Sequence, residues 1–202
     1  MKRASRLLAV LIMILPGALL PADLTIKAGV NQSKLLSKVS GHWATGYLIG
    51  AAVSFRLSDR FELQPEVFFI RRGDGIGFPE IIPGMTSKIT LDYLEMPVLL
   101  KWSFLRKPKF RMAVLGGGYA ALNLRAASRT EYEGLVFTED LKGDVNKTDF
   151  GLVAGVGLEI TLGKTKLSLD VRDSLGLAKI NGFLSNDDWK NLCLSVILGL
   201  GF

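Results

Sequence analysis

The stretch that decides the fold is Asp149-Phe-Gly-Leu-Val-Ala-Gly-Val-Gly-Leu-Glu-Ile-Thr-Leu162, in which apolar residues alternate with small or polar ones. Successive side chains of a β-strand point to opposite faces. One face of this segment is therefore apolar from Phe150 to Leu162, and the other carries glycines and Glu159. The run is longer than the about 5–6 residues usual for a strand. It fits a tilted membrane-spanning strand, which needs about 9–11 residues.

Seven further segments show the same alternation, and all eight are joined by connections of two sizes. The seven segments are residues 24–31, 46–57, 61–69, 93–102, 111–125, 166–172 and 191–202. Short connections (58–60, 105–108, 163–164) alternate with long polar ones (34–45, 72–87, 126–147, 177–188). Outer-membrane barrels collect short turns at the periplasmic mouth and longer loops at the outer mouth. The sequence therefore predicts an all-β fold, an eight-stranded antiparallel up-and-down transmembrane β-barrel.

The first 22 residues have the features of a signal peptide. Lys2, Arg3 and Arg6 precede an apolar run over residues 7–20, and Ala22 is a small residue suited to cleavage. The run is short for a spanning helix, which needs about 20 apolar residues. We expect a signal peptide at 1–22 and a barrel domain at 23–202, with a retained N-terminal anchor as the alternative.

Charge and cysteine content exclude some classes of partner. Three of the 25 Lys and Arg residues lie in the leader, which leaves 22 against 19 Asp and Glu. The remainder has no dense basic run with interleaved aromatic residues, so a nucleic-acid partner is not expected. Cys193 is the single cysteine and has no partner for an internal disulfide. We interpret it as an inert buried residue.

The polar face of the predicted strands carries equal numbers of basic and acidic side chains. The interior of an eight-stranded barrel is just wide enough for side chains to fill, and an unpaired charge there is costly. We therefore expect a charge network in the lumen, with an open pore as a weaker alternative. Its predicted members are Lys27, Arg56, Glu62, Glu66, Glu95, Lys101, Arg111, Glu159, Asp170 and Arg172. In a soluble lipocalin-like barrel, the other alternative, these charges would face water.

Aromatic residues near the predicted strand ends favour the membrane interpretation. Outer-membrane barrels carry aromatic girdles at both interfaces, and we expect Tyr47, Trp102, Trp189 and Phe202 in them. A last strand ending on Phe202 also resembles the signal read by the outer-membrane assembly machinery. We expect that machinery as a partner during insertion, and outer-membrane lipid as the surrounding medium.

Four stretches resemble the PorT-like outer-membrane β-barrel proteins. They are Leu24-Thr-Ile-Lys-Ala-Gly-Val-Asn31, Leu63-Gln-Pro-Glu66, Leu91-Asp-Tyr-Leu-Glu-Met-Pro97 and Asp149-Phe-Gly-Leu-Val-Ala-Gly-Val-Gly157. The similarity runs in order along essentially the whole chain after the leader. The resemblance implies an eight-stranded barrel in the outer membrane. The namesake of the family is associated with export through the type IX secretion system, so the resemblance also implies secretion or envelope proteins as partners.

The sequence offers little catalytic chemistry. His42 is the single histidine and lies near Ser40 in a predicted loop, whereas a Ser-His-acid site needs all three groups in contact. With one histidine and one cysteine, we expect neither a metal cluster nor a cofactor. A small outer-membrane enzyme built around His42 is the alternative to a non-enzymatic role.

The long loops are the remaining candidates for function, because rigid scaffolds often carry their binding residues on loops. Ile76, Phe78, Ile81 and Ile82 form an apolar group that either contacts a partner or packs against the loop bases. We predict a non-enzymatic structural or interaction component linked to protein secretion or surface assembly.

Overall fold

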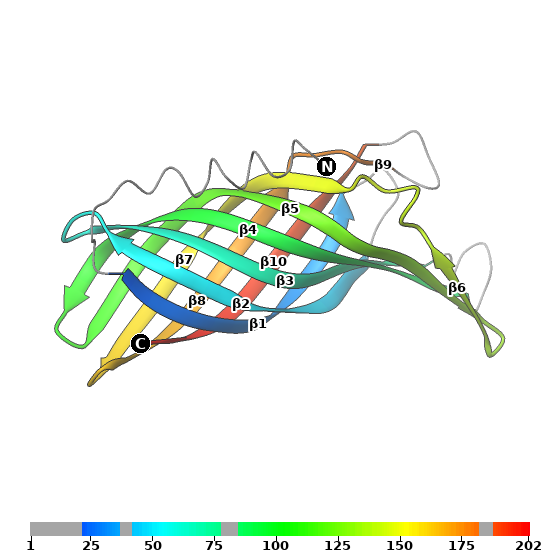
Figure 1. Cartoon of the computed structure of the whole chain (residues 1–202). Coiled ribbons are helices and arrows are strands. Elements are labelled where there is room, and N and C mark those ends of the chain that lie inside the picture. Colours follow the sequence, from blue (N-terminus) through cyan, green and yellow to red (C-terminus); the bar gives the residue numbers. More distant parts are fainter. Residues whose placement is uncertain (1–21, 37–41, 78–84, 182–187) are drawn as a thin grey trace.

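Eight long antiparallel strands form the wall of the barrel in the computed structural model (Figure 1). The structure describes residues 22–36, 42–77, 85–181 and 188–202. The wall strands are β1 (Ala22–Leu36), β2 (His42–Arg56), β3 (Phe61–Gly77), β4 (Thr86–Lys107), β5 (Phe110–Tyr132), β7 (Thr148–Leu162), β8 (Thr165–Gly176) and β10 (Asp188–Gly201). Two short strands, β6 (Leu135–Asp140) and β9 (Ile180–Asn181), pair with β5 and β10. No helix among these residues is long and apolar enough to cross a membrane.

The barrel closes where the first wall strand meets the last. β1 pairs with β2 on one side and with β10 on the other, in a register that runs from Thr25 opposite Gly201 to Leu36 opposite Lys190. Closure satisfies the backbone hydrogen bonds of the wall within the protein itself, which a bilayer requires. The predicted fold class is therefore confirmed.

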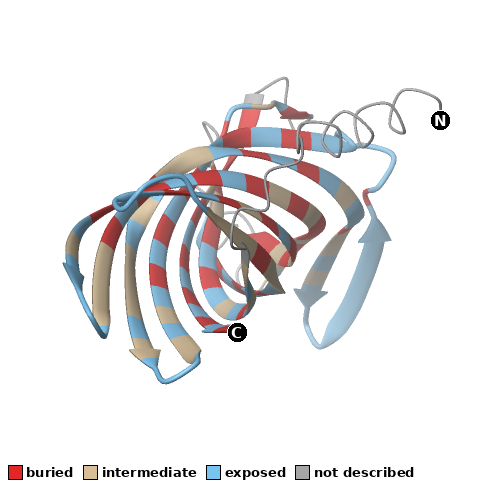
Figure 2. Cartoon of the chain, turned by 60° about the vertical axis from the view of Figure 1, so that its left-hand side comes forward, coloured by how far each residue is buried: buried red, intermediate tan, exposed pale blue. Residues whose placement is uncertain are grey.

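Buried and exposed residues alternate along the wall strands (Figure 2). In β7, Phe150, Leu152 and Val156 are exposed on the outer surface, whereas Asp149 and Val153 are buried inside. The outer surface is thus apolar and the inner surface holds most of the charges. This is the arrangement expected when lipid surrounds the barrel.

Polar and aromatic side chains mark both edges of the apolar band. Near the long-loop end, Arg71 binds Asp92 through two hydrogen bonds of 2.6 and 2.8 Å, and its guanidinium lies 5.3 Å from the ring of Tyr47. Near the short-turn end, Trp102 and Phe104 are exposed with ring centroids 6.3 Å apart. Ten residue steps separate Asp92 from Trp102 on β4. At about 3.4 Å per residue and a tilt of about 40°, they span a height of about 26 Å, which matches the about 25 Å band of such barrels.

Trp189 does not belong to the aromatic girdle, so that prediction is wrong. It lies in β10 on the same face as Asn191 and Cys193, and it is buried inside the barrel. Residues two apart on a strand share a face, so Trp189 points inward with the two buried residues that follow it.

Several strands extend well beyond their predicted ends, because the segments expected to be long loops are largely strand. β4 and β5 have 22 and 23 residues, against 12 and 14 for β8 and β10. Outside the bilayer both faces of the extended sheet can be polar, so the apolar alternation used to find the strands fades there. With β3 and β6, these strands form a sheet that projects past the barrel at the long-loop end (Figure 1).

Two leucines of similar exposure can test the membrane interpretation. Leu198 (64% exposed) lies on the barrel wall four residues before Phe202, whereas Leu135 (60% exposed) lies on the projecting sheet. Replacing Leu198 by Arg should lower the free energy of unfolding in phospholipid vesicles by about 2–4 kcal/mol, the usual cost of an arginine near the bilayer midplane. Replacing Leu135 by Arg should change it by less than about 0.5 kcal/mol. Urea titration followed by heat-modifiable gel mobility measures both. Equal effects would contradict a lipid-embedded wall.

Candidate functional site

The middle of the lumen is filled by a quartet of two cations and two carboxylates, formed by Lys27 on β1, Glu66 on β3, and Asp170 and Arg172 on β8. The Lys27 Nζ atom lies 2.8 Å from both Glu66 Oε1 and Asp170 Oδ2. Arg172 donates hydrogen bonds to Glu66 Oε1 at 2.9 Å and to Asp170 Oδ2 at 2.7 Å, and it forms a further bond with Glu66 Oε2. The four side chains are at most 3% exposed.

The quartet is electrically neutral and joins strands from opposite ends of the sequence. Its partners are up to 143 residues apart, so it ties the N-terminal strands to β8 across the lumen. Lys101 lies beside it and donates to Gln64 Oε1 at 3.2 Å. Buried charges of this kind are stable only when they are paired and hydrogen-bonded. Removing one member should therefore cost far more than breaking a surface pair.

A second buried cluster centres on Arg72, toward the long-loop end. Arg72 forms an ion pair with Glu95, and its Nη1 atom lies 3.6 Å from Asp149 Oδ2. Its guanidinium lies 5.1 and 5.8 Å from the ring centroids of Tyr119 and Tyr93, within the range of a cation–π contact. The Asp149 carboxylate also accepts hydrogen bonds from Tyr119 at 3.0 Å and from Asn191 at 2.7 Å.

Sequence reasoning missed Arg72 as a member of the lumen network and assigned it to a loop. The sequence does contain a sign of its position. Arg72 is an even number of residues from Glu62, Gln64 and Glu66, so it lies on the same inward face once the strand continues to Gly77. The prediction ended this strand at residue 69. Asp149 was placed on the inner face but was not recognised as a partner for an arginine.

The remaining predicted lumen charges gather at the short-turn mouth. Arg111 forms an ion pair with Glu62 and lies 4.0 Å from Glu159, and Arg56 lies 3.9 Å from Glu62. Arg56 is 41% and Glu159 19% exposed, so these two members of the group reach solvent, whereas Glu62 (9%) and Arg111 (13%) lie deeper. The ten predicted residues thus divide into a buried middle and a hydrated mouth.

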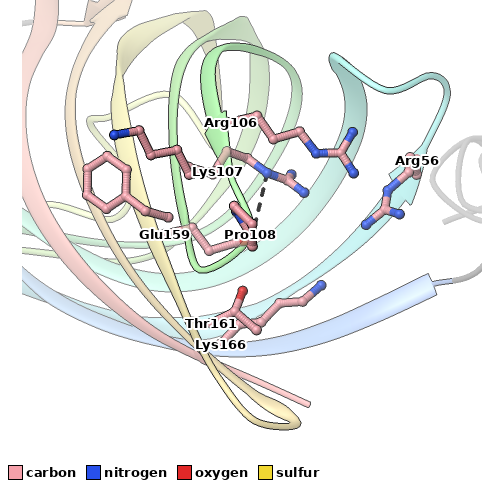
Figure 3. A pocket seen from close by; sticks show the side chains of 9 residues that line it. Arg56, Arg106, Lys107, Pro108, Glu159, Thr161 and Lys166 are labelled. Atoms are coloured by element: carbon pink, nitrogen blue, oxygen red, sulfur yellow. Dashed lines mark ion pairs between the residues drawn. The ribbon is translucent and has the colours of Figure 1, made fainter.

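The two mouths of the barrel differ in character. At the long-loop end, Leu141, Ile180 and Trp189 are buried in the hydrophobic core, with Val145 packed against it. An open pocket of about 520 Å³ also lies there, between the ends of β2, β3, β4 and β5. In the middle, a cavity next to Glu95 and Arg172 holds about 10 Å³, no more than about one water molecule. At the short-turn end, an open pocket of about 510 Å³ is lined mainly by basic residues (Figure 3).

The residues predicted to form a loop site around His42 or an apolar loop contact do not form a site among the described residues. His42 is exposed at the start of β2, and Ser40 lies outside the described residues. Ile76 belongs to β3, whereas Phe78, Ile81 and Ile82 lie outside the described residues. The predicted signal peptide also lies outside them, apart from Ala22, at which β1 begins.

A closed eight-stranded barrel with an apolar outer surface and a charged, filled lumen defines an outer-membrane β-barrel protein. A family model described as "Outer membrane protein beta-barrel domain" matches residues 18–182, and the chain belongs to this family. It is an integral protein of the outer membrane.

Comparison with solved structures supports the fold. Neisserial surface protein A matches with a TM-score of 0.50 and 15% identity, over 89% of this chain and 97% of the other. OprG of Pseudomonas aeruginosa matches with a TM-score of 0.50 and 12% identity, over 90% and 95%. The outer membrane protease OmpT of Escherichia coli reaches a TM-score of 0.46 at 12% identity, over 93% and 99%. A search of curated proteins found no match. The first two similarities show the shared fold.

We predict that the quartet contributes strongly to the free energy of unfolding of the barrel. Replacing Lys27 by Met leaves two carboxylates against one arginine and should lower the free energy of unfolding by about 3–5 kcal/mol, the usual cost of an uncompensated buried charge. Adding Asp170→Asn restores neutrality through the Glu66–Arg172 pair and should recover part of that loss. As a control, Asp59→Asn removes an exposed partner of Arg106 and should cost less than about 1 kcal/mol. If the Lys27 variant unfolds like the wild type in vesicles, the quartet does not stabilise the barrel.

Proposed function

We propose that this protein is a non-enzymatic outer-membrane scaffold that displays its projecting sheet at the cell surface as a docking element for another protein. The observation that carries the proposal is the unpaired outer edge of β6. Among the described residues, β6 pairs with β5 alone. All six of its residues are exposed.

The turn before β6 determines which backbone groups face this edge. Glu133 and Gly134 both have positive φ, 49° and 80°, as a two-residue type I′ hairpin requires. Tyr132 therefore lies in a hydrogen-bonded pair with Leu135, and the ladder ends with the Leu141 N–H donating to the Ala126 carbonyl at 3.0 Å. Odd-numbered residues of β6 thus bond to β5. The N–H groups of Val136, Thr138 and Asp140 point away from it.

The β6 edge also carries apolar side chains outside the bilayer. Leu135, Val136 and Phe137 are 60, 48 and 61% exposed. Soluble proteins usually protect such an edge with charge, proline or a covering element, because it is a template for another strand. In β6 the charges, Glu139 and Asp140, lie in the second half, and residues 135–137 are uncharged. Strand addition combines main-chain hydrogen bonds with contacts from alternate side chains. The occupant we propose is therefore an extended segment of a second surface protein.

The resemblance to PorT-like barrels supports a place in protein secretion or surface assembly. A docking strand on a sealed membrane scaffold suits such a role, because it recruits another component without passing solute. Outer-membrane assembly machinery is the further partner we propose, acting while the barrel inserts.

Site-specific photocrosslinking tests the proposal in cells. With p-benzoylphenylalanine in place of Phe137, we expect a discrete adduct with another outer-membrane or surface protein. A second change, Thr138→Pro, removes one outward N–H and no bond to β5, and should reduce the adduct at least about fivefold. Thr138→Ala keeps that N–H and serves as the matched control.

Folding of each variant is monitored by heat-modifiable gel mobility, and the same photoreactive group at Leu198 reports background from the lipid-facing wall. An adduct that is equally strong with proline and alanine at residue 138 would contradict docking by strand addition. No adduct above the Leu198 background would contradict a partner at this sheet.

A further inference from the structure

The pocket at the short-turn mouth has a composition unlike the rest of the lumen. Its lining contains five basic side chains and one acidic one: Arg56, Arg106, Lys107, Arg111 and Lys166, with Glu159. Thr161, Pro108 and Phe110 complete the lining. The charged ends of Arg56, Arg106 and Lys166 converge on the same space (Figure 3). The volume of about 510 Å³ lies within the range of small-molecule sites.

A β-bulge directs one of these cations into the pocket. Along β4, Leu99, Lys101 and Ser103 face inward, so a regular strand would turn Arg106 outward. Ser103 pairs with Ala113 but Leu105 pairs with Met112, so Phe104 is an extra residue. Bulges re-aim the side chains that follow them.

As a result, Arg106 lies directly opposite Arg111 on β5. Like charges in this position repel each other. The local backbone therefore concentrates positive charge at this mouth instead of dispersing it.

The neighbouring carboxylates do not neutralise the mouth. Lys166 pairs with Asp23. Arg106 donates a hydrogen bond to the Asp59 carbonyl at 2.7 Å and lies 3.2 Å from the Asp59 carboxylate, which is 93% exposed and so screened by water. A single carboxylate, Glu62, is the ion-pair partner of both Arg111 and Arg56. Including the adjoining turns, this end of the barrel carries eight basic residues and four acidic ones. They are Arg56, Arg60, Arg106, Lys107, Lys109, Arg111, Lys164 and Lys166, against Asp23, Asp59, Glu62 and Glu159.

We infer that the short-turn mouth is a binding site for a phosphate-bearing anion. Arginine guanidinium groups bind phosphate oxygens through paired, charge-assisted hydrogen bonds, and here Arg56, Arg106 and Arg111 approach one open space from three strands. Short turns face the periplasm in outer-membrane barrels, so this mouth opens on that side. The phosphate therefore comes from a periplasmic solute or from a phospholipid headgroup of the inner leaflet.

Calorimetric titration of the full-length barrel with inorganic pyrophosphate, in an uncharged detergent at low salt, tests the site. We expect saturable binding at one site per barrel. Replacing Arg56 and Arg106 by Gln should weaken it at least about tenfold, because two of the phosphate donors are lost. Both side chains are about 40% exposed and lie outside the buried quartet, so the fold should persist, which heat-modifiable mobility verifies.

The matched control replaces Arg125 and Arg129, two exposed arginines at the other end of β5, by Gln. This pair makes the same change in net charge and should leave binding unchanged. Absence of saturable binding by the wild type, or equal weakening in both double variants, would overturn the proposal.

Nanodiscs distinguish the two sources of phosphate. The comparison is made at an ionic strength that screens the surface charge of the bilayer. If phosphatidylglycerol nanodiscs then weaken pyrophosphate binding relative to detergent, the lipid headgroup competes for the pocket and is its source of phosphate. If binding is equal in detergent and in phosphatidylglycerol and phosphatidylcholine nanodiscs, the pocket takes a soluble anion.

Discussion

Charge pairing within a narrow lumen is the constraint on which the rest of this structure depends. Eight strands leave space for side chains and almost none for water. Lys27 and Arg172 form ion pairs with Glu66 and Asp170. Each of these buried charges needs an opposite charge because water does not reach them. The same interactions join β1, β3 and β8 across the interior. Neutrality of the quartet and filling of the middle of the lumen therefore have a single structural cause.

A filled middle leaves the two ends of the barrel as the regions available for interaction. At the outer end, Leu141, Ile180 and Trp189 pack into the hydrophobic core. There β3 to β6 continue as a sheet, and the outer edge of β6 has no partner among the described strands. At the periplasmic end, the lumen opens into a basic pocket whose positive charge is increased by a bulge in β4. The wall between them contributes rigidity, holding β6 outside and the converging arginines inside.

Much of the fold could be predicted from the sequence, because alternation and connection length are local signals. They identified eight strands and the inward parity of residues such as Lys27 and Glu66. Contacts between distant residues could not be predicted, since the Lys27–Asp170 pair depends on barrel closure and register. Arg72 was missed because apolar alternation fades where the sheet leaves the membrane. Arg106 was missed because residues 105–108 were expected to form a turn, whereas β4 continues to Lys107. The extra residue at Phe104 then turns Arg106 inward, and nothing in the local pattern indicates that bulge.

The claim of a sealed middle is tested most directly by electrical recording from purified protein in planar lipid bilayers. The account predicts no persistent unitary conductance after insertion, which is verified by recovering folded, heat-modifiable protein from the same lipid. Recurrent conductance steps of constant size would contradict it. They would mean that ions pass the Lys27–Glu66–Asp170–Arg172 quartet and that the lumen itself is a functional path.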